Sequence, residues 1–306
     1  MKTARSIRIG TRNSPLALYQ SREVQRRLCN LGMPSEIIEI TSDGDMDLVT
    51  PLYDMGIQGI FTKSLDVALL QNNVDIAVHS TKDIPTKQAQ GLTLSAVLER
   101  ATSLDCLVLP AGTLTIDFTK ENIIATSSLR RKLQWSNRYP HHKTENLRGN
   151  IQTRLEKLDQ SDWHGAIFAQ AALNRLEISS HHMIPLDWML PSPAQGAIGI
   201  VCREDDQHAL EVCHAINHSN TKMCISVERD FLAALHGGCA VPIAAYAELR
   251  NDELFFKGNI TSLDAKEKIE IEMKFSLKEV AHAGELAAEA IRKRGAIEII
   301  KTFRPS

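Results

Sequence analysis

The chain contains 306 residues, of which 43% are hydrophobic and 24% are charged. This composition is ordinary for a folded globular protein and excludes a disordered chain, a collagen-like repeat or a coiled coil as a description of the whole. Lysine and arginine number 35 against 37 aspartate and glutamate, so the formal net charge of −2 provides no overall basic field that would attract nucleic acid.

The sequence has features typical of a cytoplasmic protein. No stretch approaches the roughly 20 apolar residues that a membrane span needs. Charges occupy the first ten positions, where a signal peptide would need its apolar segment. The six cysteines include no Cys-x-x-Cys pair, and in a cytosolic chain of this length we expect them to be reduced.

Short apolar segments alternate with amphipathic ones through the first two thirds of the chain. A helix is predicted to begin with Ser14 as its N-cap and Pro15 in its first turn, and to end before Gly32. Thr62 is predicted to cap a second helix that ends near Leu70. The predicted strands are residues 6–9, 36–41, 74–78, 92–98, 105–109, 122–125, 144–147, 165–168 and 198–201. This alternation predicts α/β units around a parallel or mixed sheet.

The last third has a different pattern. Residues 241–249 and 253–258 flank the turn signal 250–252, which predicts a β-hairpin. A strand over 268–275 and a helix over 277–293, stopped by Gly295, follow. We therefore expect a small α+β module that begins near Thr221. The sequence shows no internal repeat, and residues 99–103 are the best candidate for an earlier domain boundary.

Polar side chains follow several of the predicted strands directly. Ligands in open α/β sheets bind beyond the carboxyl ends of the strands, and hydroxyl groups at a helix start favour anions. The residues in question are Arg12, Ser14, Lys82, Asp83, Thr126, Ser127, Ser128, Arg130, Arg131 and Arg148.

Arginines are the main signal among these residues. For a single arginine, solvated surface charge or helix capping is the simpler interpretation, but the set as a whole predicts a ligand with many negative charges. The chain lacks a Walker loop, and no Gly-x-Gly-x-x-Gly turn follows the first strand. A polycarboxylate is therefore favoured over a nucleotide. The arginines are Arg12, Arg130, Arg131, Arg148, Arg154 and Arg175.

Two further residues have alternative interpretations. Asp83 either makes a turn before Ile84-Pro85 or supplies a carboxylate that accepts hydrogen bonds from ligand N–H groups and stabilises a developing cation. Cys239 is either a buried thiol at the end of a helix or a sulfur that Gly237 and Gly238 leave accessible.

A metal site is also conceivable, but it is disfavoured because the candidate ligands lack the paired spacing of zinc sites, and none is expected. The candidates are Cys202, His208, Cys213, His214, His218 and Cys224.

Taken together, these motifs resemble the porphobilinogen deaminase (hydroxymethylbilane synthase) family along essentially the whole chain. The segments that carry the resemblance are residues 11–18, 75–85, 126–131, 147–150, 153–155, 195–197 and 237–242. The resemblance implies two α/β domains like type II periplasmic binding proteins, formed by residues 1–99 with 196–220 and by residues 100–195. It also implies a C-terminal α+β domain over residues 221–306 that carries the cofactor cysteine.

The family resemblance implies a transferase of tetrapyrrole (heme) biosynthesis that acts as a monomer. Four porphobilinogen molecules would be joined head to tail, with release of four ammonia molecules, to give the linear tetrapyrrole hydroxymethylbilane. A dipyrromethane cofactor would be bound to Cys239 through a thioether. Each pyrrole carries an acetate and a propionate, which accounts for the arginine set.

The resemblance also implies individual roles. Asp83 would be catalytic: it would hold pyrrole N–H groups and stabilise the azafulvenium cation that forms as ammonia leaves. The cofactor-binding residues would be Lys82, Thr126, Ser127, Ser128, Arg130, Arg131 and Arg154, beside Cys239. The substrate-binding residues would be Arg12, Ser14, Arg148, Arg175 and Gln195.

Three positions depart from the family pattern. Gln58 stands where the active-site loop often has a lysine, His236 replaces a glutamate, and Ala194 replaces a glycine. A non-catalytic polyanion-binding module of the periplasmic-receptor type is the alternative function. The predicted third domain with its cysteine counts against that alternative, as does the lack of an export signal.

Overall fold

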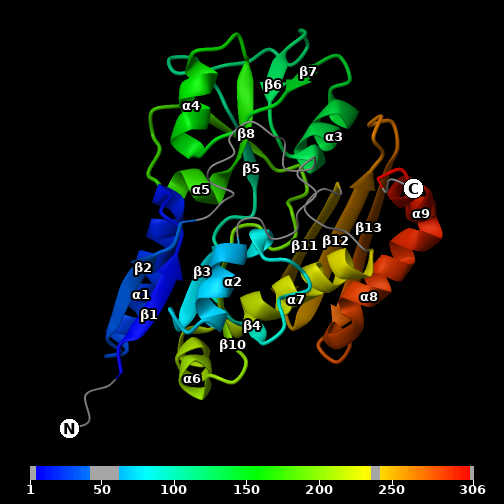
Figure 1. The fold of residues 1–306 in the computed structure, drawn as a ribbon. Coiled ribbons are helices and arrows are strands. Elements are labelled where there is room, and N and C mark those ends of the chain that lie inside the picture. The colour runs from blue at the N-terminus through cyan, green and yellow to red at the C-terminus, as the bar shows by residue number, and fades with distance from the viewer. Residues whose placement is uncertain (1–4, 42–61, 236–241, 304–306) are drawn as a thin grey trace. The chain divides into compact units, whose positions relative to one another are not determined.

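The computed structural model describes residues 5–41, 62–235 and 242–303. These residues form two compact units (Figure 1). The first unit contains residues 5–41, 62–101 and 196–222, and the second contains residues 102–195, 223–235 and 242–303. The second unit therefore groups the middle of the chain with its C-terminal third, and the three predicted domain boundaries stay predictions.

The first unit is built on a five-stranded mixed sheet. Its strands are β1 (Ile7–Thr11), β2 (Ser35–Glu39), β3 (Ile76–Ser80), β4 (Leu92–Val97) and β10 (Ile198–Arg203), in the order β2-β1-β3-β10-β4. Strand β1 is parallel to β2 and β3, whereas β10 is antiparallel to both β3 and β4. A strand from much later in the chain thus completes the first sheet.

Helices cover both faces of this sheet. Helix α1 (Pro15–Asn30) and helix α6 (Gln207–Ile216) pack on one face, and α2 (Lys63–Leu70) packs on the other. Ser14 caps α1 as predicted, because its Oγ accepts a hydrogen bond from the backbone N–H of Ala17. Thr62 occupies the predicted N-cap position of α2, and the helix ends at Leu70 as predicted, but Thr62 has a helical conformation and makes no side-chain cap bond. Its hydroxyl bonds instead to the carboxylate of Asp66 within the helix.

The second unit contains a sheet with the same strand pattern. Its strands are β5 (Asp105–Val108), β6 (Ile123–Ala125), β7 (Lys143–Glu145), β8 (Gly165–Ala169) and β9 (Met183–Leu186), in the order β7-β6-β8-β5-β9. Strand β6 is parallel to β7 and β8, and β5 is antiparallel to β8 and β9. As in the first sheet, one antiparallel strand lies between the parallel set and the edge strand. The two sheets repeat one topology although the sequence shows no repeat.

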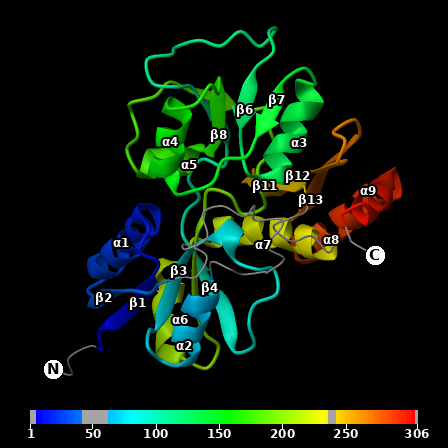
Figure 2. The same ribbon diagram turned by 45° about the horizontal axis from the view of Figure 1, so that its top comes forward.

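Side chains alternate between the two faces of this second sheet. Cys106 and Val108 pack under α4 (Ile151–Asp159) and α5 (Gln170–Arg175), whereas Leu107 packs with Trp135 of α3 (Leu129–Arg138) on the opposite face. Figure 2 shows α4 and α5 on one side of this sheet and α3 on the other. Helices therefore cover both faces of the short strands. This explains why the sequences of these strands are continuous apolar runs.

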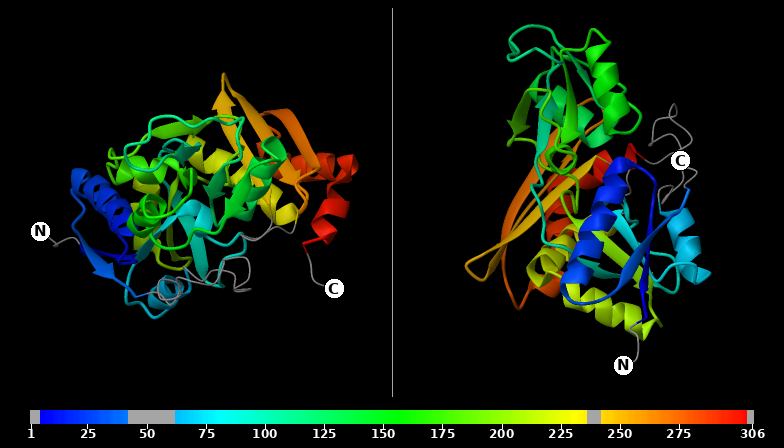
Figure 3. Two further views of the ribbon diagram at one scale, coloured as in Figure 1. Left: turned by 90° about the horizontal axis from the view of Figure 1, so that it is seen from above. Right: turned by 90° about the vertical axis from the view of Figure 1, so that its left-hand side faces the viewer.

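An antiparallel sheet of three strands forms the C-terminal part (Figures 1 and 3). The strands are β11 (Ile243–Arg250), β12 (Glu253–Thr261) and β13 (Lys268–Ser276). The predicted hairpin is confirmed, but its turn is shorter than the predicted 250–252, because Arg250 pairs with Glu253. Asn251 and Asp252 both have positive φ, of 48° and 61°, as a two-residue hairpin turn requires. Helices α7 (Ser219–Ala234) and α8 (Val280–Ile291) contribute to the core on this sheet.

The predicted stop at Gly295 is confirmed. Gly295 has a φ of 101° within the irregular turn Arg292–Ala296, which separates α8 from the short helix α9 (Ile297–Lys301). The fold class is thus two α/β sheets that share one mixed topology and a smaller α+β part at the C-terminus.

Ala194 occupies a conformation that normally selects glycine. Its φ is 63°, its side chain is 1% exposed, and its backbone N–H donates to Glu228 Oε2 at 2.6 Å. An L-residue in this left-handed region costs about 1–2 kcal/mol. Alanine in place of glycine therefore leaves strain at this position.

We expect Ala194→Gly to destabilise the chain by about 1–2 kcal/mol less than Ala166→Gly, measured by urea unfolding. Ala166 is also fully buried but lies in strand β8. Both substitutions remove a buried methyl group and both add backbone freedom to the unfolded chain, so the difference isolates the left-handed strain. Equal losses would contradict the assignment.

Candidate functional site

In the first unit, two parallel strands end at the same sheet edge and are followed by predicted site residues. Ile9 of β1 pairs with Ile76 of the parallel strand β3, so the segments that follow the two strands leave the sheet at the same end. Arg12 follows β1, and a single 3-10 turn, Thr81–Asp83, follows β3. The structure thus brings Arg12, Lys82 and Asp83 to one edge.

The Thr81–Asp83 turn is fixed by backbone hydrogen bonds. The N–H of Ile84 donates to the carbonyl of Thr81 at 3.2 Å, and the N–H of Thr81 donates to the carbonyl of Ala197 at 3.1 Å. Gly199 of β10 lies beneath it: a Cβ at position 199 would lie 2.9 Å from Ile84 Cδ1 and 2.9 Å from Thr81 Oγ1. A larger residue at position 199 would require the side chains of Thr81 and Ile84 to shift, so glycine allows the turn that carries Asp83 to pack closely on β10.

The start of helix α1 adjoins this edge. Gln20 Nε2 donates to Ser80 Oγ at 2.9 Å, which joins α1 to the end of β3. Burial, together with the positive charge of Arg12, lowers the pKa of His79 to about 4, so this imidazole is uncharged at neutral pH. Ser14 belongs to the same edge, where its hydroxyl caps the helix as described above.

In the second unit, a buried carboxylate gathers three predicted site residues. Asp105 Oδ2 accepts a hydrogen bond from Arg130 Nη2 at 2.7 Å. Its Oδ1 accepts from Arg131 Nη2 at 2.7 Å and from Gln195 Nε2 at 2.9 Å. Asp105 is 0% exposed, and the two arginines are 5% and 6% exposed. Asp105 was not among the residues predicted from the sequence. The signal that could have identified it is a carboxylate at the start of an otherwise apolar strand.

This cluster carries an excess of positive charge. Burial raises the pKa of Asp105, but the neighbouring guanidinium groups outweigh burial and hold this pKa at about 2. Two guanidinium groups and one carboxylate therefore leave one net positive charge, because arginine stays protonated in proteins. Buried charge of this sign favours an anionic ligand at the adjoining sheet edge.

Hydroxyl groups occupy the turn between β6 and α3. Ser128 caps α3, with its Oγ accepting from the N–H of Arg131 at 3.5 Å. Thr126 Oγ1 accepts from the N–H of Ser128 at 3.3 Å. Ser127 Oγ accepts from the N–H of Leu147 at 3.1 Å and also contacts the Leu147 carbonyl, which ties this turn to the segment after β7.

The segment after β7 leads into a second helix start at the same edge. Asn150 caps α4 through a 2.9 Å bond from the N–H of Thr153, and Gly149 has a φ of 118°. Arg154 Nε donates to the Gly149 carbonyl at 2.7 Å, and the buried Arg148 immediately precedes this glycine. Arg175 is the last residue of α5, the helix that follows β8.

Several sequence predictions fall elsewhere. Cys239, His236 and Gln58 lie outside the described residues. Cys202 and Cys213 belong to the core of the first sheet, whereas Cys224 belongs to the core of the C-terminal sheet. Within the described ranges, no group of three or more histidine, cysteine or acidic residues could hold a metal ion. None of the helices described is long and apolar enough to cross a membrane.

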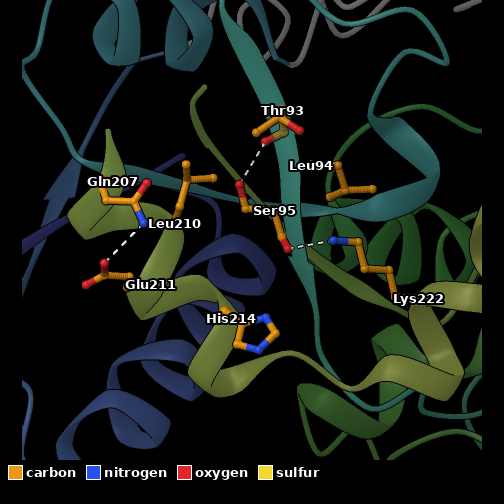
Figure 4. A pocket seen from close by; sticks show the side chains of 8 residues that line it. All are labelled: Thr93, Leu94, Ser95, Gln207, Leu210, Glu211, His214 and Lys222. Carbon is orange, nitrogen blue, oxygen red and sulfur yellow. Dashed lines mark hydrogen bonds between the residues drawn. The ribbon is translucent and has the colours of Figure 1, made fainter. Parts of the chain in front are cut away.

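A surface pocket of about 530 Å³ in the first unit contains none of the predicted site residues (Figure 4). Its polar groups are bonded to one another: Lys222 Nζ donates to the Ser95 carbonyl at 2.8 Å, and Gln207 Nε2 donates to Glu211 Oε1 at 3.1 Å. The lining residues are Thr93, Leu94, Ser95, Gln207, Leu210, Glu211, His214 and Lys222. We assign no role to this pocket.

We expect Asp105→Ala to lower the free energy of unfolding by about 3–5 kcal/mol, because it leaves two buried guanidinium groups without their shared carboxylate. Asp117→Ala is the control, since Asp117 is exposed in the same unit and bonds only within its own turn and to Lys120. Similar unfolding midpoints in urea for the two variants would contradict the central role of Asp105.

Comparison with known proteins identifies the family. Residues 7–211 match the model of the porphobilinogen deaminase dipyromethane cofactor binding domain, and residues 222–293 match that of the porphobilinogen deaminase C-terminal domain. A porphobilinogen deaminase from Nostoc sp. is 38% identical, over 98% of this chain and 95% of the relative. The enzyme of that name from Chlorobium phaeovibrioides is 37% identical over 97% of both chains.

Among solved structures, similarity extends over a smaller part of the chain. A probable amino-acid transporter extracellular-binding protein from Bacillus subtilis covers 70% of this chain and 90% of its own, with 11% identity and a TM-score of 0.41. The two family models together span both α/β sheets and most of the C-terminal part. The chain belongs to the porphobilinogen deaminase family.

Proposed function

We propose that this chain is a hydroxymethylbilane synthase, a transferase of tetrapyrrole biosynthesis that condenses four porphobilinogen molecules head to tail. The match to the cofactor-binding model over residues 7–211 is the observation that carries this proposal. In each addition the aminomethyl C–N bond of porphobilinogen breaks and ammonia leaves. A C–C bond then forms to an α-carbon of the growing chain, and that carbon loses its proton. Product release would require the C–C bond between the cofactor and the first added unit to break, with a proton returned to the cofactor carbon and water added to the freed methylene carbon as the hydroxymethyl group.

The residues of the second unit suit a dipyrromethane cofactor, whose acetate and propionate arms are anionic. The excess positive charge of Arg130 and Arg131 at Asp105 would attract these arms. The helix starts at Ser128 and Asn150 add N–H groups and a positive dipole end. The cofactor supplies a nucleophilic pyrrole α-carbon when it is bound. In our proposal it is attached through a thioether to Cys239.

The family resemblance supports a role for each of the predicted binding residues. Thr126, Ser127, Ser128 and Arg154 would hold the cofactor together with the Arg130–Arg131 pair and Lys82. Arg12, Ser14, Arg148, Arg175 and Gln195 would bind the carboxylates of the incoming substrate. Because Arg130, Arg131 and Gln195 already bond to Asp105, they would act mainly by charge and by fixing the sheet edge.

Asp83 is proposed as the catalytic residue. The bonded Thr81–Asp83 turn over Gly199 would hold its carboxylate in one place. A carboxylate fixed there can accept hydrogen bonds from pyrrole N–H groups and stabilise the positive charge that develops on the substrate as ammonia departs. The uncharged His79 nearby adds no further positive charge to oppose that cation.

We further propose that the enzyme is a cytoplasmic monomer that acts on a small molecule and binds neither nucleic acid nor membranes. The family resemblance and the net charge of −2 support this view. A non-catalytic polyanion-binding module is the alternative, and it differs from an enzyme in needing neither Cys239 nor Asp83.

Mass spectrometry of the intact purified chain tests the cofactor attachment. We expect a mass above that of the sequence by one dipyrromethane, and we expect Cys239→Ala to lack this increment. Cys29→Ala is the matched control, because Cys29 is an exposed free thiol in helix α1. An active wild-type chain with no added mass would refute the attachment.

Asp83→Asn tests the catalytic assignment. Asparagine keeps the size of the side chain but removes its charge, so we expect kcat for porphobilinogen consumption to fall by about 10²-fold or more while the added cofactor mass is retained. The control is Asp205→Asn, an exposed carboxylate in the same unit. Near-wild-type turnover in Asp83→Asn would exclude the proposed role.

A further inference from the structure

A small cavity lies beside the Thr81–Asp83 turn, inside the first unit. Its volume, measured as the space open to the centre of a water molecule, is about 10 Å³. Ile84 and Val201 form part of its apolar wall, and Asp66, His79 and Gln88 supply polar groups. The cavity thus touches the chain before the turn, the chain after the turn and helix α2.

Two polar atoms of this lining lack a hydrogen bond. His79 Nε2 and Gln88 Nε2 are both buried, and neither has a hydrogen-bond partner in the described part of the chain. His79 as a whole is only 5% exposed. Buried polar groups are almost always hydrogen-bonded to protein or to ordered water, so two such atoms in one cavity point to a bound molecule.

The third polar group is the carboxylate of Asp66, which also lines the cavity. Burial raises the pKa of Asp66, while the Thr62 hydroxyl bonds to its carboxylate and opposes this shift. The carboxylate has further acceptor capacity, because each of its oxygens can take two hydrogen bonds. The cavity therefore presents an amide donor, a carboxylate acceptor and an imidazole nitrogen.

We propose that this cavity binds one buried water molecule, held by Gln88, Asp66 and His79, and that this water positions the turn carrying Asp83. A cavity of about 10–15 Å³ on this measure holds one water, which needs two to four polar partners. The water accepts from Gln88 Nε2 and donates to the Asp66 carboxylate. It can donate to His79 Nε2 or accept from it, so either imidazole tautomer is satisfied.

The positioning role follows from where the three partners lie in the chain. His79 is in β3, directly before the turn, and Gln88 lies shortly after it, whereas Asp66 belongs to α2. A water bonded to all three would link both ends of the turn to the helix. The effect on catalysis rests on the proposed function; the binding of water does not.

A crystal structure of the cofactor-loaded full chain, at a resolution that reveals ordered water, tests the binding. We expect one density peak at about 2.7–3.2 Å from both His79 Nε2 and Gln88 Nε2. An empty cavity, or a direct bond between these two side chains, would overturn the proposal. Val201→Ile keeps all three polar groups but adds a carbon atom to the wall, and we expect the peak to be absent in that variant. Its control is Val212→Ile, which overpacks the opposite face of the sheet.

Gln88→Met tests the positioning role, because methionine matches the length of glutamine but donates no hydrogen bond. We expect kcat to fall by up to about 10²-fold, with KM and the added cofactor mass unchanged. Gln207→Met, at an exposed glutamine of α6, is the control and should behave as wild type. Unchanged kcat in both Gln88→Met and Val201→Ile would refute the positioning role. A wild-type chain that shows the peak but consumes no porphobilinogen would refute the proposed function and leave the water site standing.

Discussion

The second unit depends on one carboxylate that has no access to solvent. Asp105 holds two consecutive arginines of α3, and it also accepts a hydrogen bond from Gln195, far along the chain. Because removing two guanidinium groups from water is expensive, this arrangement is stable only while the carboxylate stays ionised between them. Glu228 acts in a similar way: it binds the N–H groups of Ala194 and Ala247, and so fixes the segment that leads to Gln195.

The strand pattern explains why polar residues collect where they do. In each unit, parallel strands end at a common edge, and β1, β6 and β7 are each followed by a turn whose hydroxyl or amide side chain caps the next helix. The resulting N–H groups and dipoles favour anions without any lysine-rich surface. This is how a chain with a net charge of −2 can be suited to an acidic ligand.

Local signals in the sequence predicted the local structure well. Ser14 and Pro15 begin α1, and Asn251 with Asp252 makes the predicted hairpin turn. The failures concern partners distant in the chain. The bonds of Arg130 and Arg131 to Asp105 could not be predicted, because nothing near these arginines in the sequence reveals a carboxylate about 25 positions earlier. A local difference is Thr62, which lies at the N-cap position of α2 but bonds to Asp66 instead of capping the helix. The positive φ of Ala194 could not be predicted, because tertiary contacts determine this angle and the local sequence does not reveal it.

Strand β10 carries a consequence for the order in which the chain folds. In the described part of the first sheet, β4 is paired with β10 alone, and β10 also supplies Gly199 beneath the Asp83 turn. Residues 102–195 are synthesised between β4 and β10. During translation, the N-terminal sheet therefore lacks β10, and β3 and β4 lack their shared partner strand, until the whole second sheet has been synthesised. The turn that carries the carboxylate obtains its support only late in translation.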